Sequence, residues 1–335
     1  MMGKASTPSE CIAAIIHEVI PESNFRQQMQ LTAERYLDQA QDDLSFGFVP
    51  TVICSAISGE TEKAIPVTAA WQLIQLAAKL FDDIEDGDAI QRIADSTNLA
   101  TGFLFAAHAA LDRMVDYGVS LEQCHRVKVG LHRACLCACA GQDADFQARY
   151  SLDPPDPDGW LEIAGRKSGE LFAWACQAGG IVADVDETVQ TYLWEYGLRL
   201  GTLVQIADDF NGIWGSAGEI DLLNGQWTLP IIYACYVADP VEKKTLDSLI
   251  KSAAQGNREA AINAQAKISA LGAQKFILVV AFTQRSEAIE ALNHIALSPS
   301  ARQRLVVILD QVFPVLAQVG PSSHGSNTKF ILASE

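Results

Sequence analysis

The sequence predicts a single all-α domain, built as a helical bundle. Apolar residues recur at three- and four-residue spacing over long stretches, whereas the two-residue alternation of half-buried strands is scarce. No linker long enough to separate two domains interrupts the chain. With 335 residues, of which 49% are hydrophobic and 19% charged, the chain is long and apolar enough to bury a large core.

Five helical segments are clearest in the periodic pattern. They cover Val67–Phe81, Leu99–Met114, Trp160–Ile181, Val189–Ile206 and Arg302–Leu316. Groups of turn-forming residues lie between them, at Phe46–Pro50, Ser58–Glu60, Asp153–Gly159 and Gly215–Gly225. We expect the ordered all-α domain to span residues 11–320, between a flexible N-terminus (1–10) and a flexible C-terminal tail (321–335).

The charge balance and the cysteine content limit the partners and the cellular compartment that we expect for the protein. Lys and Arg total 24 and Asp and Glu total 41, which gives a net charge of −17 and argues against nucleic acid as a partner. Eight cysteines are too few for a disulfide scaffold and indicate reduced thiols in the cytoplasm. The apolar run Phe276–Phe282 is too short to cross a bilayer, so we expect no stable membrane insertion.

Two helices are predicted to end in clusters of carboxylates. The first cluster holds Asp82, Asp83, Glu85, Asp86 and Asp88, directly after an apolar helical run, and the second holds Asp208 and Asp209. Helix C-termini disfavour carboxylates, and like charges this close repel each other unless a cation lies between them. Two solvated helix ends are the simpler interpretation. A pair of facing Mg²⁺-binding motifs at the mouth of an apolar bundle is the alternative that the repetition favours.

These residues resemble motifs of the trans-isoprenyl diphosphate synthase family, also called polyprenyl synthetases. Asp82, Asp83 and Asp86 match the DDxxD motif, and Asp208 and Asp209 match a second aspartate-rich motif. Gly212 stands where that motif usually has its third aspartate. The stretches Gly141–Phe146 and Arg166–Ser168 are similar to two further elements of the family, and the matches run in order over about residues 40 to 235.

The resemblance implies an isoprenoid-synthase-type helical bundle around a central apolar cavity. It also implies a cluster of three Mg²⁺ ions that binds a prenyl diphosphate and withdraws it to leave a carbocation. Metal binding and catalysis fall to the aspartates of the two motifs, which are Asp82, Asp83, Asp86, Asp208 and Asp209. Binding of the diphosphate falls to Arg92, Arg166, Lys167 and Gln205. The family is commonly dimeric, so a homodimer is a further expectation.

The chain departs from the family where a second substrate, isopentenyl diphosphate, would bind. The segment Ser45–Pro50 contains none of the basic residues of the corresponding motif, and Phe46 lies among the replacements. Gln75 and Gln226 stand where the family has a histidine and a lysine. Ala77 and Ala78, shortly before DDxxD, resemble members with room for a twenty-carbon chain.

The first functional hypothesis is therefore a Mg²⁺-dependent class I terpene synthase. Its substrate would be a fifteen- or twenty-carbon prenyl diphosphate, linear or already cyclised, supplied by an upstream cyclase or prenyl synthase. The cation would be quenched by proton loss or by water. Two alternatives remain: a trans-prenyltransferase, and a non-catalytic regulatory subunit of a prenyl synthase.

Overall fold

The computed structural model describes residues 4–39, 45–85, 91–150, 154–215 and 218–314. Within these ranges every regular element is helical, which confirms the all-α fold. The N-terminal elements are α1 (Pro8–Val19), α2 (Asn24–Gln39), η1 (Phe46–Phe48), α3 (Val49–Ser58), η2 (Glu62–Ala64), α4 (Ile65–Glu85), α5 (Ile93–Asp112) and η3 (Arg113–Tyr117). The central elements are α6 (Leu121–Tyr150), α7 (Pro157–Ala164), η4 (Gly165–Gly169), α8 (Glu170–Val182) and α9 (Glu187–Trp214). The C-terminal elements are α10 (Ile220–Leu223), α11 (Leu229–Val237), α12 (Pro240–Ala253), α13 (Arg258–Ala270), α14 (Ala273–Asn293) and α15 (Pro299–Val312).

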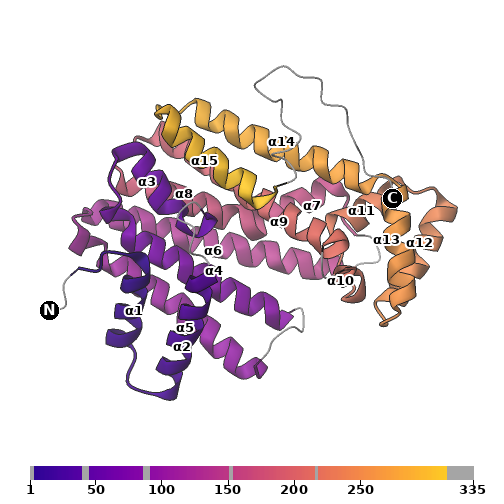
Figure 1. The fold of residues 1–335 in the computed structure, drawn as a ribbon, viewed down its shortest axis with the longest axis horizontal. Coiled ribbons are helices and arrows are strands. Elements are labelled where there is room, and N and C mark those ends of the chain that lie inside the picture. The colour runs from indigo at the N-terminus through magenta and orange to yellow at the C-terminus, as the bar shows by residue number, and fades with distance from the viewer. Residues whose placement is uncertain (1–3, 40–44, 86–90, 151–153, 216–217, 315–335) are drawn as a thin grey trace.

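Long helices form the middle of the bundle. Helices α4, α6, α8 and α9 run through its length, with α14 and α15 along one side and α1, α2 and α5 along the other (Figure 1). Helix α9 packs between α8 and α14, and α4 packs along α5. The short helices α10 to α13 gather at one end (Figure 1) and enclose a smaller apolar cluster of their own.

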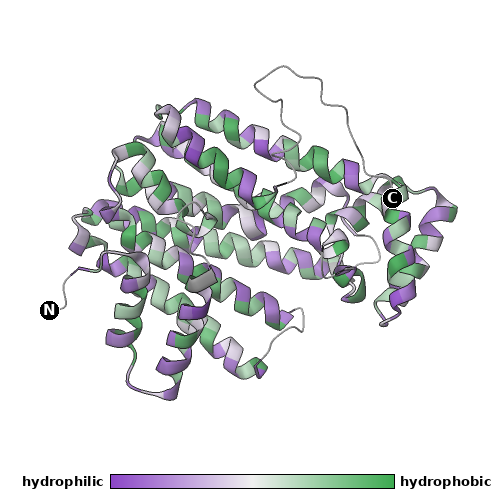
Figure 2. Ribbon diagram, viewed as in Figure 1, coloured by the Kyte–Doolittle hydropathy of each residue, from purple (hydrophilic) through white to green (hydrophobic). Residues whose placement is uncertain are grey.

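Helix α4 is a core helix. The helical stretch Glu62–Glu85 is long and apolar enough to cross a membrane by length and composition alone, but 72% of its most apolar window is buried within the bundle. The hydropathy colouring shows apolar and hydrophilic residues interspersed on helices throughout the bundle (Figure 2). Trp71 of α4 is fully buried, and its indole Nε1 donates a hydrogen bond to the carbonyl of Phe46 at 2.9 Å. Helix α4 is therefore buried and apolar over most of its length and charged only in its last turns.

The first helix begins earlier than expected. Helix α1 starts at Pro8, inside the segment 1–10 predicted to be flexible. The Thr7 side chain accepts a hydrogen bond from the backbone N–H of Glu10, and the Glu10 carboxylate accepts one from the backbone N–H of Ser6. This reciprocal cap, followed by proline at the first helical position, fixes the helix start. Residues 1–3 and the expected tail 321–335 lie outside the described residues.

Two predicted helices end earlier than expected. Helix α5 ends at Asp112 and passes into the tighter turn η3, so the predicted segment Leu99–Met114 is not one continuous helix. Helix α15 ends at Val312, before the expected end at Leu316. Pro314 explains this second difference, because the residue before a proline is disfavoured in the helical region. Phe313 accordingly leaves it, with φ −137° and ψ 82°.

Candidate active site

The two acidic helix ends lie close enough to interact. Asp82 and Asp83 lie in the last turn of α4, and Asp208 lies on α9. Asp208 is exposed to solvent as a residue, but protein atoms crowd its carboxyl group. This crowding, and next the negative charge of Asp82, raise the pKa of Asp208 to about 6, against the smaller opposing effects of Lys167 and Lys79. Asp82 and Asp208, from two different helices, are therefore close enough for the charge of one to act on the other.

Two lysines accompany the carboxylates. Lys79 pairs with Asp83 one turn further along α4, with 2.6 Å between Nζ and Oδ1. Lys167 pairs with Asp145 of α6, with 3.3 Å between Nζ and Oδ2, and both side chains are mostly buried. Lys167 lies in η4, a π-helical turn between α7 and α8, and such turns are frequent at functional sites. Gly141 of α6 permits this contact, because a side chain there would overlap the Lys167 backbone.

Asp209 is held differently from its neighbour. Its carboxylate is buried and accepts hydrogen bonds from the backbone N–H of Leu229 at 2.7 Å and from Gln205 Nε2 at 3.2 Å. Burial raises the pKa of Asp209 well above its usual range, against these hydrogen bonds. Gln205 also accepts a hydrogen bond from Ser168 of η4. Asp209 therefore ties α9 to α11 and, through Gln205, to the π-helical turn.

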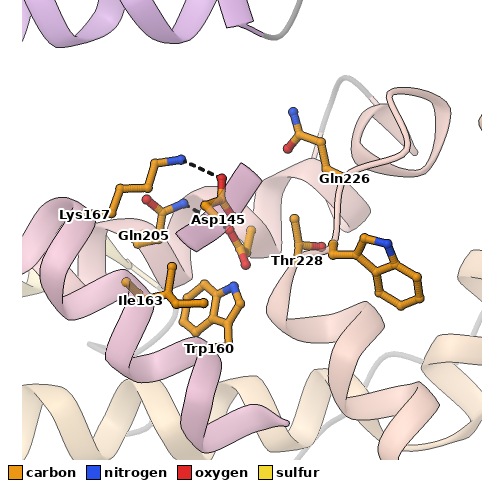
Figure 3. A pocket seen from close by; sticks show the side chains of 10 residues that line it. Asp145, Trp160, Ile163, Lys167, Gln205, Gln226 and Thr228 are labelled. Atoms are coloured by element: carbon orange, nitrogen blue, oxygen red, sulfur yellow. Dashed lines mark hydrogen bonds and ion pairs between the residues drawn. The ribbon is translucent and has the colours of Figure 1, made fainter. Parts of the chain in front are cut away.

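A polar pocket lies beside Asp209. It is lined by the indole of Trp160, by nearby apolar side chains and by the polar side chains of Lys167, Gln205, Asp145, Gln226 and Thr228. Figure 3 shows Lys167 pointing toward Asp145, with Gln205 next to them and Gln226 on the opposite wall. The glutamine at 226 thus lies at the site, as the alignment with the family's lysine implies.

Three charged residues of this site, Lys79, Asp145 and Asp221, were not among the predicted site residues. Lys79 could have been found, since it lies four residues before Asp83, the spacing of a helical ion pair. Asp145 belongs to a stretch that the resemblance included, without a role. Asp221 of α10 has no local signal: it is almost fully buried, and a side chain at Gly212 of α9 would overlap its carboxyl group.

The carboxylates fit Mg²⁺. It prefers hard oxygen ligands, keeps several waters, and is commonly bound by one or two carboxylates together with substrate phosphates. Asp82 and Asp208 supply such oxygens, and their mutual repulsion is the kind that a cation relieves. In the described part of the chain no group of three or more His, Cys, Asp or Glu side chains is placed so that it could hold a metal ion by itself. Asp86 lies outside the described residues.

Other predicted site residues make different contacts, and their assignment stays a prediction. Arg92 faces solvent and pairs with Asp95, and Arg166 pairs with Glu162 one turn before it. Ala77 is fully buried whereas Ala78 is exposed, so the two do not line one wall together. Phe46 packs beside Phe172, with 5.8 Å between the two ring centroids.

The comparisons with known proteins identify the family. The sequence pattern of the family described as polyprenyl synthetase matches residues 12–267, more than half of the chain. The chain belongs to the polyprenyl synthetase family. A geranylgeranyl diphosphate synthase from Mycobacterium tuberculosis is 30% identical over 194 residues, which is 54% of this chain and 55% of that protein. The match covers only 55 to 60% of the length of the first three curated relatives.

Solved structures agree with this polyprenyl synthetase in fold. A geranylgeranyl pyrophosphate synthetase from Pyrococcus horikoshii superimposes with a TM-score of 0.77 at 23% identity, covering 91% of this chain and 95% of that chain. A polyprenyl synthase from Caulobacter crescentus, in complex with calcium and isoprenyl diphosphate, superimposes with a TM-score of 0.76 at 23% identity. The match covers 91% of this chain and 92% of that chain. The isoprenoid-synthase-type bundle is therefore confirmed.

Proposed function

We propose that this polyprenyl synthetase is a Mg²⁺-dependent trans-prenyltransferase that ionises an allylic prenyl diphosphate and passes the prenyl group to an acceptor. The observation that carries the proposal is the pair of acidic helix ends, Asp82 with Asp83 and Asp208, beside Lys79 and Lys167. The named relatives, which are prenyl diphosphate synthases, support the transferase class over the terpene synthase that the sequence first suggested. The eight free thiols are consistent with a reducing, cytoplasmic setting.

The chain's own residues have separate tasks in this reaction. Asp82, Asp83 and Asp208 would hold Mg²⁺, whose positive charge would neutralise the negative charge of the departing diphosphate. Lys167 gives a further positive charge at the diphosphate and is held in place by Asp145. Asp209 and Gln205 fix α9 against α11 and η4, so that Asp208 keeps its position.

Release of diphosphate tests this proposal. Purified protein is incubated with geranylgeranyl or farnesyl diphosphate, with and without Mg²⁺, and inorganic diphosphate is quantified. We expect Mg²⁺-dependent release that falls at least a hundredfold, on the scale of one lost charge-stabilising group, in Asp82→Asn and in Asp208→Asn. The exposed Asp116→Asn on η3 is the matched control. Full activity of both site variants contradicts the assignment.

A second candidate, the class I terpene synthase, is favoured by one specific observation. No lysine or arginine occurs in η1, in α3, in residues 65–78 of α4 or in α8. A second diphosphate would lack counter-charges among these elements. Gas chromatography with mass spectrometry of untreated extracts separates the candidates. A hydrocarbon formed without any added acceptor is the product of a terpene synthase, whereas a transferase leaves the prenyl group joined to its acceptor.

A further inference from the structure

Three uncharged side chains near η1 have buried polar atoms without hydrogen-bond partners among the described residues. The Ser45 hydroxyl, the Gln75 carbonyl oxygen, and both polar atoms of the Gln72 amide are buried and make no hydrogen bond within the described residues. Gln72 is only 1% exposed. Each buried polar group left without a partner costs about 1–3 kcal/mol. Four such atoms in one place point to a group that the protein binds there.

The three side chains converge on one glycine. A Cβ atom built on Gly47 would lie 3.5 Å from Ser45 Oγ, 3.7 Å from Gln75 Oε1 and 3.9 Å from Gln72 Nε2. Because Gly47 has no side chain, these donors and acceptors face one another around its α-carbon. We call Ser45, Gln72 and Gln75 the neutral polar cluster. Its atoms can both donate and accept hydrogen bonds, which suits a hydroxyl group or a water molecule.

The neutral polar cluster lies on the active-site side of α4. Gln72, Gln75 and Asp82 are separated by three and seven residues, which places them on one stripe of the helix. At 1.5 Å per residue, Gln75 lies about 10 Å before Asp82 along the helix axis, and Gln72 lies about 15 Å before Asp82. A prenyl group whose diphosphate is bound at Asp82 could therefore reach the cluster.

Aromatic rings border the cluster and hold its turn. The Trp71 indole donates to the Phe46 carbonyl in η1, which fixes the turn that carries Gly47. The Phe172 ring packs against both, with its centroid 4.8 Å from Trp71 and 5.8 Å from Phe46. Aromatic faces stabilise nearby cations. The surroundings thus combine groups that stabilise positive charge with neutral hydrogen-bonding groups.

We propose that the neutral polar cluster binds the uncharged hydroxyl group, of water or of an alcohol, that captures the prenyl cation. This inference rests on the proposed ionisation of a prenyl diphosphate. A diphosphate acceptor is disfavoured because η1, α3, α8 and residues 65–78 of α4 contain no lysine or arginine, so its charge would lack a partner among these elements.

The chemistry balances without a further reactant. The allylic carbon–oxygen bond breaks, and its electron pair leaves with the diphosphate. A lone pair of the bound hydroxyl oxygen then forms the new carbon–oxygen bond. The hydroxyl proton passes to the released diphosphate, because the amides of Gln72 and Gln75 can orient the hydroxyl but cannot take its proton.

Oxygen-18 water distinguishes this step from its alternatives. The protein is incubated with Mg²⁺ and geranylgeranyl diphosphate in labelled water, alone, with 3-methylbut-3-en-1-ol, or with isopentenyl diphosphate. We expect diphosphate release and a labelled prenyl alcohol, or in the second arm a prenyl ether, which identifies an alcohol as acceptor. Addition of isopentenyl diphosphate should change neither the amount of diphosphate released nor the labelled alcohol formed. Hydrocarbon alone, unlabelled alcohol, or a product lengthened by five carbons overturns the inference. No diphosphate release in any arm contradicts the proposed function itself.

Substitution of the cluster gives a second test. In Gln72→Leu/Gln75→Leu the oxygenated share of total product should fall about tenfold, on the scale of two lost hydrogen bonds, with hydrocarbon replacing it. Its melting temperature should not fall, since unpartnered polar atoms are removed. Ser45→Ala should shift the product ratio in the same direction. Gln30→Leu, at a half-buried glutamine on α2, should leave it unchanged. An unchanged ratio in both cluster variants overturns the proposal.

Discussion

The carboxyl group of Asp221 on α10 lies against the backbone of Gly212 on α9, in the space that a side chain at position 212 would occupy. Position 212 is where the second aspartate-rich motif of the family usually has its third aspartate. A carboxylate therefore does lie beside this turn of α9, but it comes from a different helix. Its charge also contributes to the raised pKa of Asp209.

A methyl group at position 212 should destabilise the protein. In Gly212→Ala the new Cβ overlaps Asp221, and forcing an extra group into a packed site typically costs about 1–3 kcal/mol. Urea unfolding followed by circular dichroism measures the loss. In an Asp221→Ala background the same substitution should cost much less, because the overlapping carboxyl group is gone. Equal costs in the two backgrounds would show that the contact does not couple the two positions.

Metal binding should weaken in acid. The pKa of Asp208 is raised to about 6, so below that pH a proton competes with Mg²⁺ for the carboxylate. We expect the apparent affinity for Mg²⁺, measured by calorimetry with inorganic diphosphate present, to fall by up to roughly tenfold per pH unit below pH 6. Asp208→Asn should bind Mg²⁺ weakly and lose this pH dependence. An affinity that is constant from pH 7.5 to 5 would exclude Asp208 as a ligand.

The same group should affect the stability of the metal-free protein in the opposite sense. Between pH 3.8 and about 6 the folded protein retains a proton on Asp208 that the unfolded chain has lost. Stability from this group therefore decreases as the pH rises through that interval. Melting temperatures of wild type and Asp208→Asn should diverge as the pH rises from 4 to 7, with the variant the more stable. Parallel curves would contradict the raised pKa.

Much of the fold could be predicted from periodicity, because α4, α8 and α9 each carry an apolar pattern that only a helix can bury. Ser58–Glu60 was likewise a reliable break, since Gly59 ends α3 with φ 77°. Side-chain partners could not be predicted in this way. Arg92 and Arg166 occupy motif positions, yet each pairs with a carboxylate three or four residues away in the sequence. The contact of Asp221 with Gly212 is visible only in the tertiary fold, since nothing in the local sequence around Asp221 indicates it.

Lys167 should be the lysine that most affects substrate affinity. It lies in the polar pocket, mostly buried, and charge-assisted hydrogen bonds contribute on the order of 1.5–3 kcal/mol. Lys167→Met should therefore raise the KM for prenyl diphosphate by roughly ten- to a hundredfold. Asp145→Asn should have a smaller effect, since it leaves the positive charge in place. Lys251→Met, at an exposed position on α12, is the control, and an equal KM for Lys167→Met and this control would contradict the assignment.

The homodimer expected from the family can be tested on the face formed by α5 and α6. Phe105, Val129 and Leu136 are exposed there by 71%, 50% and 72%. They neighbour His108 and His132, whose rings lie 5.3 Å apart and join the two helices. Exposed apolar side chains grouped in this way favour association with a second apolar surface. Light scattering should show a dimer for the wild type and a monomer for Phe105→Asp/Leu136→Asp. Val241→Asp, on α12 and equally exposed at 76%, should remain dimeric. A monomeric wild type, or dissociation by the control alone, would exclude this face as the interface.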